Sequence, residues 1–266
     1  MLLRNVFTKT IRDLRWPTFW VSLGMGGMTG YFALLFPTYS KIFDLNAMLE
    51  KMGPAAKILG ASVGDASTLV GFLHIELFSM ILPALMVTYV AGMASGFTAG
   101  EESRGTIDVL LSYPVSRRRL VLQKSAAVMI GSIVAALAVW IFAAAGAAAS
   151  GSELPWDKLA SALAMLVLLG LAFGAIALAV SAATGNRGAA IGLAVGLMVA
   201  MYLVDALAAV VDSLGIVRPL SLFRYYMGGD PLRNGISLPD AGVLAVVALG
   251  FLALALVLFE RRDLAA

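Results

Sequence analysis

Few side chains in this sequence are able to carry out chemistry. There is no cysteine and a single histidine, His74. Without cysteine the chain has no disulfide framework, thiolate nucleophile or cysteine-based metal site. A lone histidine excludes the HExxH metalloprotease motif, and a Ser-His-Asp arrangement would have to use His74. We therefore expect no catalytic residue and no metal site, and no enzymatic activity in this chain.

Three carboxylates lie within or beside long apolar runs and are candidates for lining a substrate pathway: Glu76, Asp205 and Asp212. Asp205 and Asp212 are seven residues apart, which would place both on one face of a continuous helix. A charge in mid-membrane costs roughly 3 kcal/mol. Asp205 therefore either lines a polar cavity or pairs with a cation such as Arg218. For Glu76, interfacial solvation and proton handling are the alternatives.

The most polar stretch is residues 100–119, between two long apolar runs. Glu101 and Glu102 would oppose the macrodipole at the C-terminus of the preceding helix, but would be favourable at the N-terminus of a new one. This placement predicts a break near Gly100 and a short helix over about 103–112. Such a helix would carry an apolar edge beside charged side chains: Ile107, Leu110 and Leu111 beside Arg104 and Asp108.

Pro114 should end this short helix, because proline disfavours the α conformation of the residue before it. Ser116 is then suited to cap the next helix. That helix opens with three arginines, residues 117–119, which are poorly placed for the helix dipole and need negative charge nearby. Lipid headgroups or an acidic partner surface would supply it. The stretch as a whole has the character of a cytoplasmic docking element.

The amino-acid composition indicates the class of protein to which this stretch belongs. Hydrophobic residues make up 61% of the 266 residues and charged residues 13%, and mean hydropathy is +0.92. These values are typical of an integral membrane protein. The net charge of +3 does not indicate a nucleic acid partner, because the basic residues cluster beside apolar runs.

About 20 helical residues cross the hydrocarbon core of a bilayer. The sequence predicts an all-α membrane protein with six transmembrane helices, at about 19–36, 72–97, 120–149, 159–181, 188–211 and 241–259. Pro83 should kink the second span. Residues 1–16 form a basic amphipathic pattern, typical of an interfacial helix on the anionic leaflet that leads into the first span.

Six spans place both termini on one side, and the positive-inside rule indicates which side. An arrangement with both termini in the cytoplasm places 12 of the 19 Lys and Arg residues there, together with residues 100–119. Glycines recur at four-residue spacing within several spans, including Gly26/Gly30, Gly170/Gly174 and Gly188/Gly192/Gly196. This pattern predicts close helix packing within the bundle or, alternatively, a dimer contact.

The region from Glu101 to Lys124 resembles the permease subunits of type-2 ATP-binding-cassette (ABC) exporters. In that family the second and third spans are joined by a Glu-rich turn, Gly-Thr, a Leu-Leu pair and Pro-x-Ser-Arg. The matching residues here are Glu101, Glu102, Arg104, Gly105, Thr106, Leu110, Leu111, Pro114, Ser116, Arg117 and Lys124. Leu82-Pro83 and the Gly-Asp-Pro-Leu run at 229–232 extend the resemblance, and Asp108 departs from it where the family often has Glu.

The resemblance implies a single type-2 transmembrane domain over residues 1–266, in the plasma (inner) membrane. Residues 103–112 would be a coupling helix that docks on a separate ATPase subunit, with Ile107 and Asp108 among its contacts. The chain has no P-loop motif, so ATP and Mg²⁺ would be bound by that partner. Two ATPase copies and a second permease, identical or homologous, would complete the exporter.

A secondary transporter or channel that works without an ATPase is the main alternative. Such a protein would rely on charges within the membrane rather than on a docking helix. Transport by the purified chain alone would favour this alternative.

Overall fold

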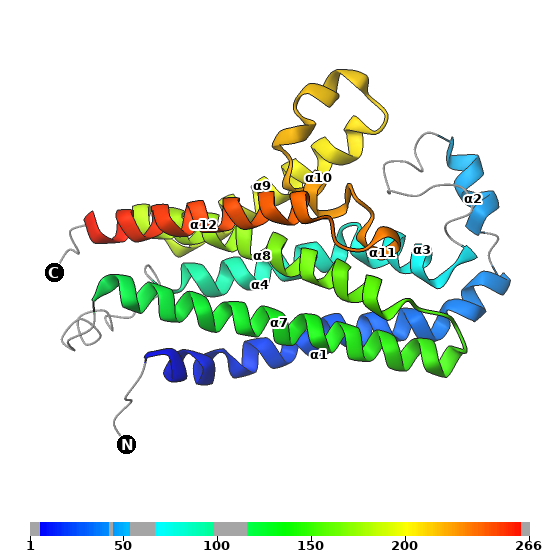
Figure 1. Ribbon diagram of the computed structural model, residues 1–266, viewed down its shortest axis with the longest axis horizontal. Helices are drawn as coiled ribbons and strands as arrows, with labels where there is room; N and C mark the ends of the chain where they lie inside the picture. The colour runs from blue at the N-terminus through cyan, green and yellow to red at the C-terminus, as the bar shows by residue number, and fades with distance from the viewer. Residues whose placement is uncertain (1–5, 43–44, 54–66, 98–115, 262–266) are drawn as a thin grey trace.

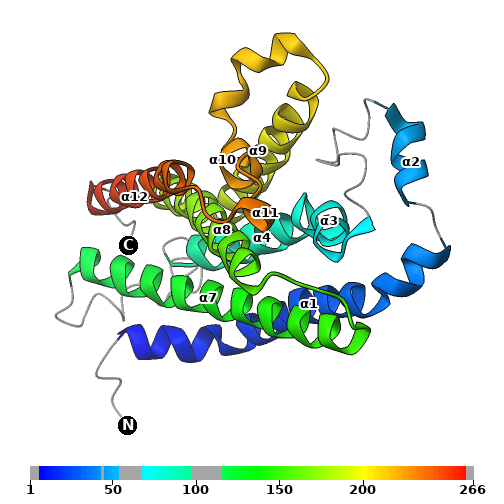
Figure 2. The ribbon, with the colours of Figure 1, turned by 45° about the vertical axis from the view of Figure 1, so that its right-hand side comes forward.

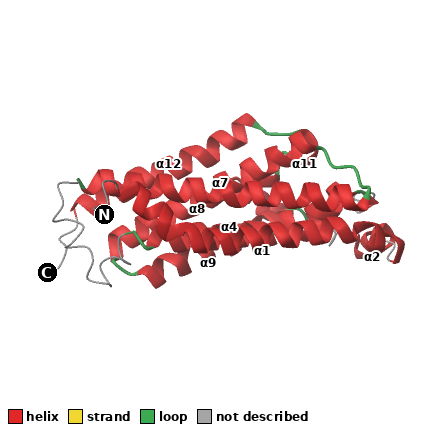
Figure 3. Ribbon diagram, turned by 90° about the horizontal axis from the view of Figure 1, so that it is seen from below, coloured by secondary structure: helices red, strands yellow, loops and turns green. Residues whose placement is uncertain are grey.

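The computed structural model describes residues 6–42, 45–53, 67–97 and 116–261. Over these ranges the chain is helical and contains no strand. The helices lie side by side in an elongated bundle, as Figure 3 shows. The long helices are α1 (Val6–Ile42), α4 (Ile81–Ser95), α7 (Arg117–Ser150), α8 (Trp156–Thr184), α9 (Arg187–Ala208) and α12 (Leu238–Arg261).

Seven shorter segments connect the long helices. They are α2 (Leu45–Met52), α3 (Leu69–Leu73), the π-helix η3 (His74–Phe78), the 3-10 segments η4 (Asp212–Ile216) and η5 (Arg218–Leu220), α10 (Leu222–Met227) and α11 (Pro231–Asn234). The start of α1 and the end of α12 lie at one end of the bundle, which we call the terminal end (Figure 1). The opposite end, where α2, α3 and α11 lie, is called the distal end.

Among the described residues, five helices are long and apolar enough to cross a membrane: α1, α7, α8, α9 and α12. The second predicted span corresponds to a bent pair, in which Leu69–Phe78 and Ile81–Ser95 meet at 44°. Counted as one broken span, this pair brings the number to six. The all-α membrane fold is therefore confirmed.

The bend in the second span has a local cause. A proline ring clashes with the carbonyl four residues before it, and for Pro83 that residue is Ser79. The helix is interrupted at this point, because Met80 leaves helical geometry with φ −143°. Pro83 itself lies in the first turn of α4, where its missing N–H has little cost. The buried Tyr226 hydroxyl donates to the Phe78 carbonyl over 3.1 Å, which satisfies one acceptor beside the break.

The first span differs from the prediction. A separate interfacial helix over residues 1–16 was expected, but α1 runs without a break from Val6 to Ile42 and includes both Pro17 and Pro37. At 1.5 Å per residue its 37 residues extend roughly 55 Å. That is longer than the roughly 30 Å hydrocarbon core. The amphipathic segment is thus an extension of the first span within the same helix.

The bundle is organised around α8. Of the residues in its most apolar part, 72% are buried, against 22% in α9 and 17% in α12. Helices α4 and α12 pack most extensively against α8, while α1 packs mainly against α7 (Figure 2). The C-terminal part of α9 and the η4–η5 segment stand away from the bundle in Figures 1 and 2.

Glycines permit the closest helix contacts. A Cβ on Gly26 would lie 2.9 Å from the Phe142 ring of α7, and one on Gly170 would lie 2.6 Å from Met86 of α4. The predicted close packing is thus found between α1 and α7 and between α8 and α4. On α9, by contrast, a Cβ on Gly192 or Gly196 would have nothing within 4 Å.

Candidate functional sites at the two ends of the bundle

The predicted docking stretch joins α4 to α7 at the terminal end. Its residues Glu101, Glu102, Arg104, Gly105, Thr106, Ile107, Asp108, Leu110, Leu111 and Pro114 lie outside the described residues, as does the expected break at Gly100. Ser116 and Arg117 lie within them. The Ser116 hydroxyl accepts from the Arg119 N–H over 3.3 Å, so Ser116 is the N-cap of α7 as predicted.

The arginines that open α7 contact the end of α12. Arg117 donates from Nη1 to the Phe259 carbonyl over 3.1 Å, and its guanidinium lies 5.6 Å from the Phe259 ring centroid. Arg118 forms an ion pair with Glu260. The C-terminal turn of a helix carries partial negative charge, so α12 supplies the charge that these cations need. Sequence reasoning had assigned this role to lipid headgroups or a partner surface.

The cytoplasm-facing end predicted for α4 is held by side chains from α8 and α9. Arg187, at the start of α9, donates from Nη2 to the Gly92 carbonyl over 3.1 Å. The Ser181 hydroxyl of α8 donates to the Ser95 carbonyl over 2.8 Å. These carbonyls belong to the last turn of α4, where intrahelical donors are lacking. From the sequence, Arg187 was counted only toward the membrane topology. Its position directly after the N-cap Asn186 is nevertheless a local signal that a cation lies where two helices meet.

Lys124 provides another contact close to the docking stretch. Its side chain is almost fully buried, and Nζ lies 5.4 Å from the centroid of the Phe97 ring. A cation above an aromatic face is attracted by the ring quadrupole. Phe97 comes shortly before the docking stretch, and Lys124 belongs to α7, which follows it. Side chains on both sides of the stretch therefore pack on the bundle.

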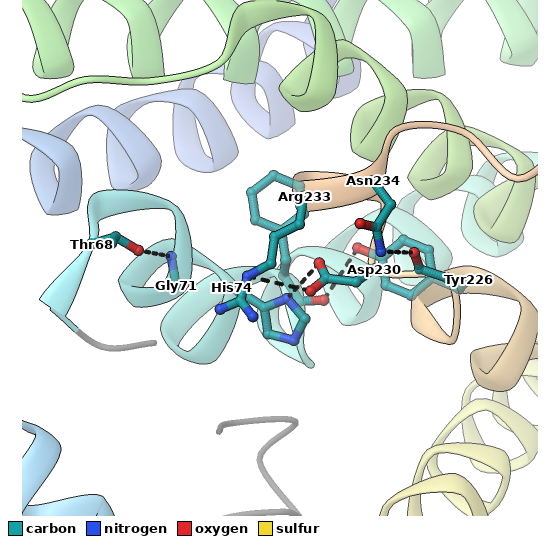
Figure 4. A network of polar contacts seen from close by, with 9 residues as sticks. Thr68, Gly71, His74, Tyr226, Asp230, Arg233 and Asn234 are labelled. Carbon is teal, nitrogen blue, oxygen red and sulfur yellow. Dashed lines mark hydrogen bonds and ion pairs between the residues drawn. The ribbon is translucent and has the colours of Figure 1, made fainter. Parts of the chain in front are cut away.

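The distal end contains a cluster of polar side chains around Asp230 (Figure 4). Asp230 Oδ1 lies 3.9 Å from His74 Nδ1 of η3, and Oδ2 lies 3.4 Å from Arg233 Nε of α11. Asp230 also adopts φ 48° and ψ 69°, the left-handed region that non-glycine residues seldom occupy. Next to it, Asn234 donates to the Gly229 carbonyl over 2.9 Å. The Gly-Asp-Pro-Leu run thus forms a compact turn that contacts the broken span.

Glu76 belongs to η3, two residues after His74, and its side chain is partly buried. A π-helix of one turn often marks a functional position. The geometry places Glu76 at the distal end of the second span, as expected, while its role in a substrate pathway stays a prediction.

The Asp205 carboxylate is paired. Its Oδ1 accepts from Arg218 Nε over 2.8 Å, which is the cation pairing considered from the sequence. The prediction that Asp205 and Asp212 share one helical face is wrong, because α9 ends at Ala208 and Asp212 begins η4. Val211 is extended there, with φ −120° and ψ 102°. A pathway role for either aspartate stays a prediction.

The comparisons with known proteins agree with this architecture. A search among curated proteins gave no match. The family model described as "ABC-2 family transporter protein" matches residues 21–264, which include every predicted span except the first two residues of the first. The chain therefore belongs to the ABC-2 family of transporter proteins.

Proposed function

We propose that this permease is part of an ATP-driven exporter, in which a separate ATPase subunit docks on the coupling helix over 103–112. Membership of the ABC-2 family is the observation that carries the proposal. The contacts around the stretch support it. Arg187 and Ser181 connect the last turn of α4 to α9 and α8, and Arg117 connects the start of α7 to α12. Displacement of the stretch would therefore act on five long helices.

The mechanism is a shift between conformational states. ATP-driven closure of two ATPase subunits moves the coupling helix over 103–112. The ends of α4 and α7 then move with it, and the spans repack to open the pathway outward. ATP and Mg²⁺ are bound by the ATPase, and the chain itself carries out no catalytic step. In this arrangement both termini are cytoplasmic, the membrane is the plasma (inner) membrane, and nucleic acid is not a partner.

The docking proposal is tested by purifying the tagged permease from native membranes together with its ATPase. Leu111→Asp and Leu110→Asp each place a charge on the apolar edge of the coupling helix. We expect either change to abolish ATPase recruitment and export. Leu238→Asp is the matched control, because Leu238 is exposed at the opposite end of the bundle. Normal recruitment by both coupling-helix variants, or transport by the permease without an ATPase, would refute the proposal.

A second permease copy would pack against α9. Gly188, Gly192 and Gly196 repeat every four residues on this helix, and Gly192 and Gly196 face open space within one chain. Small residues at this spacing allow another helix to approach closely. Because the chain lacks cysteine, Gly192→Cys introduces a unique thiol for oxidative cross-linking in membranes. We expect covalent dimers from this variant and none from Gly250→Cys on α12, whose glycine is also open.

A further inference from the structure

A long apolar groove runs between α7 and α8 at the distal end. Its volume is about 800 Å³, and its lining includes Ile133, Leu137 and Trp140 of α7 and Ala160, Ala164 and Leu168 of α8. On α8 the lining extends from Trp156 to Leu171, roughly 22 Å at 1.5 Å per residue. Half of the hydrocarbon core of a bilayer is about 15 Å thick. The groove is therefore long enough for an acyl chain that crosses its own half of the core, and shorter than the full core of about 30 Å.

The distal end of this groove is marked by two tryptophans. The rings of Trp140 and Trp156 lie 5.7 Å apart, and Trp140 Nε1 donates to the Trp156 carbonyl over 3.2 Å. Tryptophan is enriched where headgroups meet the hydrocarbon. The pair thus indicates that the boundary between lipid acyl chains and lipid headgroups lies at the start of α8.

A polar pocket of about 760 Å³ adjoins the same tryptophan. Trp156 lines both the groove and this pocket, which lies between the start of α3, the α7–α8 turn and α11. The charged side chains that line the pocket are Glu153, Lys158 and Arg233. Lysine and arginine bind phosphate through charge-assisted hydrogen bonds, and a carboxylate accepts the same kind of bond from an ammonium group. The pocket therefore presents both signs of charge to a ligand.

We propose that these two hollows form one binding site for a phospholipid with a primary-amine headgroup, such as phosphatidylethanolamine. Its phosphate binds Lys158 and Arg233, its ammonium group binds Glu153, and an acyl chain follows the groove past Ala160 and Ala164. A spanning helix would fit this site less well, because the groove is shorter than the hydrocarbon core of about 30 Å and its end opens on charged side chains. Lipid binding at this site requires neither the ATPase nor transport activity.

The chain part of the site is tested by native mass spectrometry of the full-length permease in an equimolar mixture of phosphatidylethanolamine and phosphatidylglycerol. We expect the wild type to retain phosphatidylethanolamine preferentially after detergent washing. Ala160→Trp fills the groove and should lower retention about tenfold. The control is Ala145→Trp, at an exposed alanine of α7 outside the groove. Equal retention by the two variants would overturn the proposal.

The headgroup part is tested by Glu153→Gln and Lys158→Gln. The first should abolish the preference for phosphatidylethanolamine, and the second should weaken retention of both lipids, whereas Lys9→Gln at the terminal end should change neither. Unchanged preference in Glu153→Gln would refute the assigned headgroup. A photoreactive label on Ala164→Cys, unique in this cysteine-free chain, identifies the occupant of the groove. A cross-link to lipid supports the site, while a cross-link to a second permease copy or another protein would overturn it.

Discussion

The two ends of the bundle are joined by different kinds of contact. At the terminal end, Arg187 and Arg117 donate to main-chain carbonyls of α4 and α12. At the distal end, Asp230 is held by the side chains of His74 and Arg233. A carbonyl in a helical turn moves only with its helix, so the terminal contacts connect whole helices. The contacts of Asp230 join individual side chains and can change while the helices stay in place, whereas the Tyr226 hydroxyl connects the same end to the Phe78 carbonyl.

We therefore expect the two ends of the bundle to have different roles. Connections to backbone are suited to transmitting displacement from a docked subunit, whereas side-chain contacts around a π-helix and a bend are suited to local rearrangement. Four substitutions test the comparison, in order of decreasing expected effect.

Arg187→Ala should have the largest effect. It removes a charged donor from the Gly92 carbonyl, which then keeps only the neutral bond from the Ser95 hydroxyl over 3.2 Å. Hydrogen bonds to charged groups contribute about 1.5–3 kcal/mol. We expect stability to fall by about 2 kcal/mol in thermal unfolding in detergent, and ATP-dependent export to fall with it. Arg119→Ala, at an exposed arginine near the same membrane surface, is the control. Equal effects of the two variants would show that the α4 contact has no special role.

Tyr226→Phe tests the bend in the second span. The change removes the hydroxyl that donates to the Phe78 carbonyl, and an unsatisfied buried acceptor costs about 1–3 kcal/mol. Burial raises the pKa of Tyr226, so its phenol stays protonated and the bond should persist across the working pH range. We expect a loss of about 1 kcal/mol in thermal unfolding. Tyr225→Phe removes an exposed bond to the Pro219 carbonyl and should cost less; the reverse order would contradict this account of the bend.

Asp230→Asn should affect stability less than either change above. Asparagine tolerates the left-handed conformation that Asp230 adopts, so the substitution removes the charge without adding backbone strain. The contacts of 3.9 Å to His74 and 3.4 Å to Arg233 are long and partly exposed, and we expect a loss below about 1 kcal/mol. The control is Asp13→Asn, at an exposed aspartate of α1. If Asp230→Asn destabilised the protein as much as Arg187→Ala, the contrast between the two ends would fail.

The elements that sequence predicted well are those with local causes. A run of apolar residues is sufficient to identify a span, Pro83 accounts for the bend at Ser79–Met80, and Ser116 has the chemistry of an N-cap. The continuous α1 was missed because the basic amphipathic pattern of residues 1–16 is typical of a separate interfacial helix. Asp212 was misplaced because the end of α9 at Ala208 has only the β-branched Val210 and Val211 as a local signal.

The contacts that define the two ends were not predictable in the same way. Arg117 and Phe259 are 142 residues apart, and Tyr226 and Phe78 are 148 apart. No local pattern specifies such pairs, because they depend on which helices become neighbours. For Asp205 the sequence supplied the correct partner, Arg218, since only 13 residues separate them.

The smallest effect should come from Glu260→Gln, which removes the ion pair with Arg118 at the terminal end. Both side chains are well exposed, at 62% for Arg118 and 37% for Glu260, so solvent screens the pair. We expect a loss within about 0.5 kcal/mol, measured as a shift in denaturation midpoint that disappears at high salt. Arg117→Gln, which removes the neighbouring charged bond to the Phe259 carbonyl, should cost more and keep most of its effect in salt. If Glu260→Gln cost as much as Arg117→Gln, side-chain pairing would hold α12 to α7 as firmly as the backbone contact does, and the two ends would no longer differ in kind.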